Sequence, residues 1–207
     1  MTLLECLVGI TLCGLLLSPL LKVSALLANK QLEYEKTQSL ISDGERAFEL
    51  MGRAIRMAGH RNIKSHHRHN KADSANWFIR LEKKVGYRGS DFLGVQHELS
   101  DGVDFDCIGN SLTKERTRKN LAFQGFVVDR QAGIPKGAKA NGGSLICQSL
   151  DRQGRVQNTT LMNGVNHFFI EDITSSNSSA SKRPGGQRLY KLSLQMTDGA
   201  LLQVNMD

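Results

Sequence analysis

The first thirty residues constrain this chain more than any other stretch, because they are almost entirely apolar. Between Cys6 and Leu21 no side chain ionises apart from two thiols, and the apolar character resumes after Lys22. A run of this length matches a helix that crosses a bilayer. No basic residue precedes the apolar core and no small-x-small cleavage site follows it, so we expect a retained membrane helix rather than a secretory signal peptide.

A single carboxylate, Glu5, stands at the head of this apolar segment. An acidic side chain is expensive to place in lipid unless it finds a partner, which makes Glu5 a candidate functional residue whose partner should be positive. The alternative is that Glu5 lies in the headgroup region and stabilises the helix N-terminus through the macrodipole. Physical chemistry alone leaves both interpretations open.

The N-terminal sequence Met-Thr-Leu-Leu-Glu-Cys-Leu-Val-Gly-Ile resembles the mature N-terminus of type IV pilins and pseudopilins, which usually reads Phe-Thr-Leu-Ile-Glu-Leu. Met1 replaces the usual Phe, and Lys22 replaces a common helix-kinking Pro, with Pro19 three residues earlier. The resemblance implies a prepilin whose short basic leader is removed after a Gly and whose new amine is methylated. It further implies that Glu5 neutralises the N-terminal amine, here that of Met1, of a neighbouring subunit. The assembly surface would also include Leu3, Leu4, Leu7 and Ile10.

The sequence remains compatible with a helix after Lys30 and becomes amphipathic from Phe48 onward. Ser42-Asp43-Gly44-Glu45 is a capping-box pattern that contains a Gly, so a bend or restart is expected there. Beyond it, apolar residues recur at steps of three and four and predict a helix that packs one face on a core. This helix should end near Ala58-Gly59, where Gly favours a left-handed cap.

Residues 48–61 resemble the helix end of PilW-like minor pilins, usually Asp-Ile-Arg-Met-Ala-Gly-Tyr-Arg, with Ala54 in place of the acid and His60 in place of the Tyr. From Trp77 onward the apolar periodicity becomes two, which predicts an antiparallel sheet. Strand-like runs occur at 77–81, 103–107, 121–128, 145–150 and in a final hairpin over 192–204 that turns at Asp198-Gly199.

These patterns predict an α+β, pilin-like fold in which a long N-terminal helix precedes a β-sheet domain. Residues 1–29 would form the transmembrane and assembly helix. Residues 30–59 would continue the helix onto the domain, and residues 60–207 would form a periplasmic β-rich domain.

The four cysteines divide into two pairs. Cys6 and Cys13 lie about 10 Å apart along the apolar helix, too far for a disulfide within one chain. Cys107 and Cys147 fall in strand-like sequence, and a bridge between them is reasonable if the domain is exported to an oxidising compartment. The alternative, a metal site, lacks paired-ligand spacing such as Cys-x-x-Cys.

The formal net charge of +7 makes an acidic surface, anionic lipid or nucleic acid a plausible neighbour. Three close histidines, His66, His67 and His69, suggest a metal site, but they lack a carboxylate at ligand spacing, so we expect a solvated loop and no metal. The candidate DNA contacts are Lys64, Arg68, Lys71, Arg116, Arg118 and Lys119.

No sequence motif of catalysis is present: the chain has no Gly-rich phosphate loop, no His-Glu-x-x-His and no Gly-x-Ser-x-Gly. Asp104 and Asp106 could form a paired-carboxylate site on one strand. We expect instead that both lie on the solvent-exposed face of a half-buried strand. We therefore expect neither an enzyme nor a cofactor.

The resemblance implies a minor pilin of the PilW type that joins other minor pilins and the major pilin in a complex priming or capping a type IV pilus. The expected location is the inner membrane of a Gram-negative bacterium, with the domain in the periplasm, and then the pilus tip, in contact with the inner-membrane assembly platform. Alternatives are a J-type pseudopilin of a type II secretion system and a membrane-tethered basic domain that binds nucleic acid or peptidoglycan.

Overall fold

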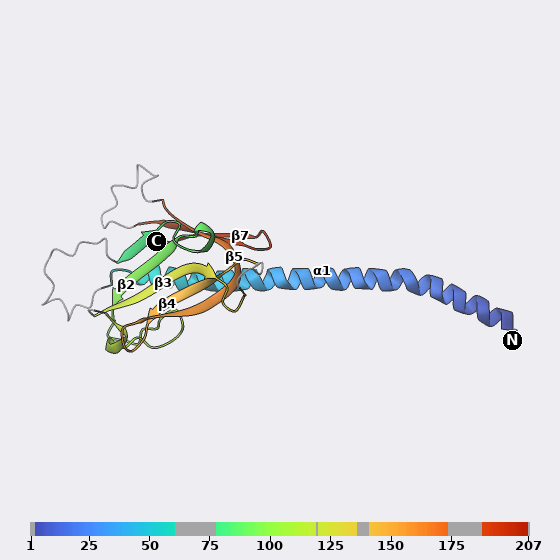
Figure 1. Ribbon diagram of the computed structural model, residues 1–207, viewed down its shortest axis with the longest axis horizontal. Helices are drawn as coiled ribbons and strands as arrows, with labels where there is room; N and C mark the ends of the chain where they lie inside the picture. The colour runs from blue at the N-terminus through green and yellow to red at the C-terminus, as the bar shows by residue number, and fades with distance from the viewer. Residues whose placement is uncertain (1–2, 61–77, 119, 136–140, 174–187, 207) are drawn as a thin grey trace. The chain divides into compact units, whose positions relative to one another are not determined.

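The computed structural model describes residues 3–60, 78–118, 120–135, 141–173 and 188–206. One long helix, α1 (Leu3–Met57), precedes an antiparallel sheet, the α+β layout that the sequence predicts (Figure 1). The seven described strands are β1 (Ile79–Glu82), β2 (Phe92–Glu98), β3 (Leu121–Arg130), β4 (Gly143–Leu150), β5 (Val156–Asp172), β6 (Tyr190–Met196) and β7 (Leu201–Met206). Two short 3-10 helices, η3 (Tyr87–Gly89) and η4 (Lys114–Arg116), lie in the loops.

The chain forms two compact units, Met1–Ser39 and Leu40–Asp207, and α1 contributes to both. The helix is uninterrupted across Ser42–Glu45, so the restart that the capping-box pattern allows does not occur. Gly44 is buried there, and a Cβ atom at this position would lie 2.5 Å from Met196 Cε and 2.6 Å from Leu202 Cδ1. This glycine therefore serves close packing of the helix on the β6–β7 hairpin rather than a break in the helix.

The last turns of α1 supply one side of the hydrophobic core. Their buried side chains are Ala47, Phe48, Met51, Ala54 and Ile55. The helix ends at Met57, and Gly59 follows with a φ of 74°, as the sequence predicts. Hydrogen bonds from the Gly59 N–H to the Gln96 carbonyl (3.1 Å) and from the Glu98 N–H to the His60 carbonyl (2.9 Å) attach this end to β2.

The sheet is a meander in which each strand pairs antiparallel with the next, in the order β1-β2-β3-β4-β5-β6-β7. Alternate residues of each strand face the core, which explains the period of two in the sequence. The face that packs with α1 carries, among others, Leu93 and Val95 of β2, Phe126 and Val128 of β3, Leu145 and Cys147 of β4, Phe168 and Ile170 of β5, and Leu192 and Leu194 of β6.

Strand β5 is long because two neighbours share it. Its first part, Val156–Val165, pairs with β4, and its second part, Val165–Asp172, pairs with β6. Where β4 has ended, the segment before β2 contacts β5 instead: the Asp91 N–H donates to the Phe168 carbonyl (2.8 Å) and the Phe168 N–H donates to Ser90 Oγ (3.2 Å). The sheet is therefore curled, since β2 and β5 are not neighbours in the strand order.

Candidate functional site: the apolar helix and the disulfide-linked loop

The apolar part of α1 leaves its side chains exposed to the surroundings. Between Leu7 and Leu27 every large aliphatic side chain is exposed, for example Leu7 at 58 % and Ile10 at 73 %. This helix is long and apolar enough to cross a membrane, a property that membrane anchors share with signal sequences. Exposed aliphatic area on this scale is costly in water, so covering it with other apolar groups is favourable.

The structure places the predicted assembly residues at the start of this helix. Leu3, Leu4 and Glu5 lie in the first turns of α1, where the described side chains begin only at Leu7, and Met1 lies outside the described residues. Leu7 and Ile10 are both exposed. At helical spacing, Leu7 and Ile10 share one face of α1.

A shallow depression in the apolar helix coincides with its small residues. It is lined by Gly9, Ile10, Cys13, Gly14 and Leu17. A Cβ atom at Gly9 or Gly14 would meet nothing within 4 Å, so no described side chain fills this space. Small residues on a membrane helix let another helix backbone approach closely.

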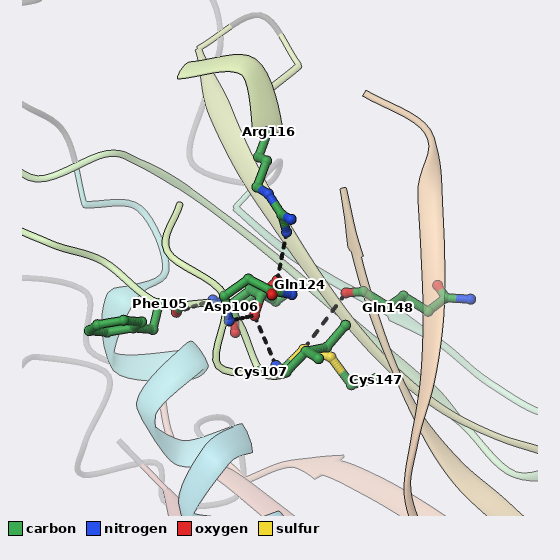
Figure 2. Close-up of a disulfide and its surroundings, with 9 residues drawn as sticks. Phe105, Asp106, Cys107, Arg116, Gln124, Cys147 and Gln148 are labelled. Atoms are coloured by element: carbon green, nitrogen blue, oxygen red, sulfur yellow. Dashed lines mark hydrogen bonds and ion pairs between the residues drawn. A yellow bond between two sulfur atoms is a disulfide. The ribbon is translucent and has the colours of Figure 1, made fainter. Parts of the chain in front are cut away.

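In the domain, Cys107 and Cys147 form a disulfide, as the sequence predicts (Figure 2). Their Cα atoms are 6.2 Å apart, and the bridge joins positions separated by 40 residues. Cys147 lies in β4 and Cys107 in the loop between β2 and β3, and both side chains are buried. The bridge therefore attaches this long loop to the middle of the sheet.

The expected strand at 103–107 is absent: apart from an isolated bridge between Phe105 and Ser111, this segment is a loop built around Asp106. The Asp106 carboxylate accepts hydrogen bonds from the backbone N–H groups of Ile108 (3.0 Å) and Asn110 (2.8 Å) and from Asn110 Nδ2 (3.2 Å). Such local bonds from an Asp side chain compete with strand pairing. The sequence signal for this turn is Asp106 followed by Gly109-Asn110.

The expectation that Asp106 lies on a solvent-exposed strand face is wrong, because this residue is only 4 % exposed. Its Oδ2 lies 3.5 Å from Arg116 Nη1, and the Arg116 side chain is 15 % exposed (Figure 2). Asp104 bonds elsewhere, accepting from the Ser100 N–H and hydroxyl at 2.7 Å each. The two carboxylates thus serve separate turns and do not form a shared acid-base site.

The candidate DNA contacts fall into two groups. Arg116 is engaged with Asp106, and Arg118 Nη2 donates to the Gly154 carbonyl (2.8 Å), so both described arginines hold loops of the domain together. The other four, Lys64, Arg68, Lys71 and Lys119, lie outside the described residues, as do His66, His67 and His69. Among the residues that are described, no group of three or more His, Cys, Asp or Glu could hold a metal ion.

No protein-family model, no curated protein and no solved structure matches this chain. The two features with functional content are the exposed apolar helix and the disulfide-linked antiparallel domain. One α-helix, α1, contributes to both of them.

Proposed function

We propose that this chain is a membrane-anchored minor pilin of the PilW type, which joins other minor pilins in a complex that primes or caps a type IV pilus. The observation that carries the proposal is that the two ends of α1 have different surroundings. Its large aliphatic side chains are exposed from Leu7 to Leu27, whereas its last turns, from Ala47 to Ile55, supply one side of the core of an antiparallel domain. The apolar part of such a helix serves first as a membrane anchor and then as an assembly surface, and its last turns pack in the core of the domain.

The mechanism is the transfer of the apolar helix from lipid into a bundle of like helices. In the inner membrane, lipid covers the exposed aliphatic side chains, and in the pilus, neighbouring helices replace it. Glu5 pairs with the N-terminal amine of an adjacent subunit, because an unpaired carboxylate at the edge of an apolar bundle is unfavourable. The small residues Gly9, Cys13 and Gly14 allow the neighbouring helix to approach.

The domain faces the periplasm in this proposal, and the Cys107–Cys147 bridge supports that location. Disulfides form and persist in oxidising compartments and are rare in the cytosol. The bridge is buried in the domain, so it is a structural link rather than an exposed redox pair.

The decisive experiment replaces the carboxylate and leaves the helix intact. In the bacterium that carries this gene, Glu5→Ala and Glu5→Gln should abolish surface pili in the sheared fraction, while the membrane level of the protein is unchanged. Glu35→Ala is the matched control, because Glu35 is an exposed carboxylate of the same helix that bonds only Gln31 among the described side chains (3.0 Å). Normal piliation in both Glu5 variants would refute the assembly role.

The alternatives predict different phenotypes for a deletion of the gene. A J-type pseudopilin of a type II secretion system would lose exoprotein secretion and retain twitching and DNA uptake. A membrane-tethered basic domain would retain both, and its binding to DNA on filters should weaken steeply as salt rises. We expect loss of twitching or DNA uptake with normal secretion.

A further inference from the structure

A groove lies between β7 and the last turns of α1. Its volume is about 270 Å³, and its floor is apolar. It is lined by Phe48, Gly52, Val204 and Met206, with the charged side chains of Glu45, Glu49 and Arg56 along the helix. We call this surface the β7 groove.

Strand β7 is the outermost strand of the sheet, and among the described strands it pairs only with β6. In antiparallel pairing each strand directs about half of its N–H and C=O groups toward either neighbour, so the outer half of those of β7 meets no described strand. Proteins usually protect such an edge with Lys, Pro or a bulge. The β7 sequence, Leu-Leu-Gln-Val-Asn-Met, has no charged residue and no Pro, and Val204 is 37 % exposed.

Two glycines of α1 allow side chains of β7 to pack closely on the helix. A Cβ atom at Gly44 would lie 2.6 Å from Leu202 Cδ1, and one at Gly52 would lie 3.0 Å from Met206 Sδ. The edge strand is therefore packed on α1 near both of its ends, and Val204 lies between them. A preorganised edge binds an added strand without a large ordering cost.

The electrostatics of the groove indicate its partner. Glu45 and Glu49 are one helical turn apart, both exposed, and neither forms an ion pair with another described residue. Two like charges at this spacing repel each other and are relieved by a cation placed between them. The lining of the groove carries these two acids and one base, Arg56, so a second copy would bring the same mixed lining, whereas a segment rich in Lys or Arg brings only positive charge.

We propose that the β7 groove binds an extended segment of a partner protein in which apolar residues alternate with Lys or Arg. The segment adds a strand to the outer edge of β7, places an apolar side chain over Phe48 and Val204, and directs a basic side chain to Glu45 and Glu49. Main-chain hydrogen bonds supply the affinity and alternate side chains the specificity, as in other strand additions. The proposal does not depend on the role of Glu5, since it is tested by peptide binding alone.

The test uses the full chain in non-ionic detergent and a fluorescein-labelled peptide of four Val-Lys repeats, with fluorescence anisotropy as the readout. We expect saturable binding that weakens roughly tenfold when Glu replaces Lys in the peptide, because two exposed ion pairs together contribute about 1.4 kcal/mol. A peptide N-methylated at alternate residues should bind as weakly, since it cannot complete the ladder.

Variants of the protein locate the binding site. Glu45→Lys combined with Glu49→Lys, and separately Val204→Asp, should each weaken binding of the Val-Lys peptide at least about fivefold. Glu171→Lys is the matched control, because Glu171 is an exposed acidic residue of β5 that does not line the groove. Absence of binding, equal binding by the N-methylated peptide, or equal losses in Glu171→Lys would each overturn the proposal. Self-association of the full chain that Val204→Asp abolishes would also overturn it, by making a second copy the occupant.

Discussion

The carboxylate of Asp91 accepts a hydrogen bond from the backbone N–H of Ile170, 2.9 Å away, although the two residues are 79 positions apart in the chain. The same side chain also accepts from the Lys84 N–H (3.1 Å) and from Lys83 Nζ (2.8 Å). Because β2 and β5 are separated by two strands in the sheet order, this buried carboxylate closes the curl of the sheet.

Asp91→Ala should therefore destabilise the domain by about 3 kcal/mol, because it removes a buried charged acceptor and leaves two backbone N–H groups unpaired. The measurement is urea unfolding of the full chain in detergent, followed by circular dichroism. Glu171→Ala, which removes an exposed carboxylate from β5, should change the free energy of unfolding by less than about 0.5 kcal/mol. Similar effects of the two substitutions would contradict the closing role of Asp91.

Removal of the disulfide should be more damaging. The double variant Cys107→Ala and Cys147→Ala opens a link across 40 residues, which in the chain-entropy model costs about 4 kcal/mol. For a domain of this size the melting temperature should fall by roughly 10 °C. A reductant should shift the melting temperature of the unmodified protein by a similar amount and leave the double variant unchanged; a reductant effect on the variant would show that another contact is responsible.

Gly44 provides a test of close packing between α1 and the β6–β7 hairpin. Gly44→Val places methyl groups where Met196 Cε and Leu202 Cδ1 already lie, so the hairpin must move, at a cost of about 2 kcal/mol. Gly102→Val is the control, because a Cβ atom at Gly102 meets only Ser100 Oγ, at 3.7 Å. The idea fails if both variants have the melting temperature of the unmodified protein.

His97 should make the domain sensitive to acid. Its side chain is 1 % exposed, and this burial holds the pKa of the imidazole below its usual value, with Asp104 raising the pKa and His60 lowering it further. The folded protein therefore binds the proton less well than the unfolded chain. Stability should be complete above pH about 6.5, the unfolded pKa, and should be lost as the pH falls from there toward the folded pKa.

The measurement is the melting temperature between pH 7.5 and 5.0. His97→Gln should reduce the loss of stability on acidification, even if it lowers stability at neutral pH. His60→Gln, which changes an exposed imidazole near the end of α1, should leave most of the loss in place. An unchanged slope in His97→Gln would show that other groups cause the acid sensitivity.

Local patterns in the sequence were sufficient for the elements whose form depends on neighbours a few positions away. The apolar run before Lys22 predicts a membrane-length helix, and the Gly at position 59 marks its far end. The alternation in β3, β4 and β6 predicts strands with one buried face. These predictions were correct because helix and strand periodicities are set by the backbone itself.

The pattern was misleading where a side chain formed bonds that periodicity does not represent. The apolar residues Val103, Phe105 and Cys107 alternate with polar ones as in a strand. The Asp106 carboxylate, however, accepts hydrogen bonds from backbone N–H groups that would otherwise pair with a neighbouring strand. Gly44 looked like a break in the helix because its neighbour, the β6–β7 hairpin, is about 150 residues away in the sequence. Both errors concern contacts that only a folded chain brings together.

The sequence by itself determined that this chain has an apolar segment of membrane length with an acid at its head, a helix end that can pack on a core, and two cysteines suited to one bridge. Only the tertiary structure decided that Asp91 closes the sheet on β5, that Arg116 is held by a buried carboxylate, and that β7, which pairs only with β6 among the described strands, lies beside Glu45 and Glu49. The physical reason is the distance along the chain over which each property is set. Hydrophobic periodicity is a local property of the chain, whereas the partner of a buried carboxylate or a strand edge is chosen by the long-range path of the backbone.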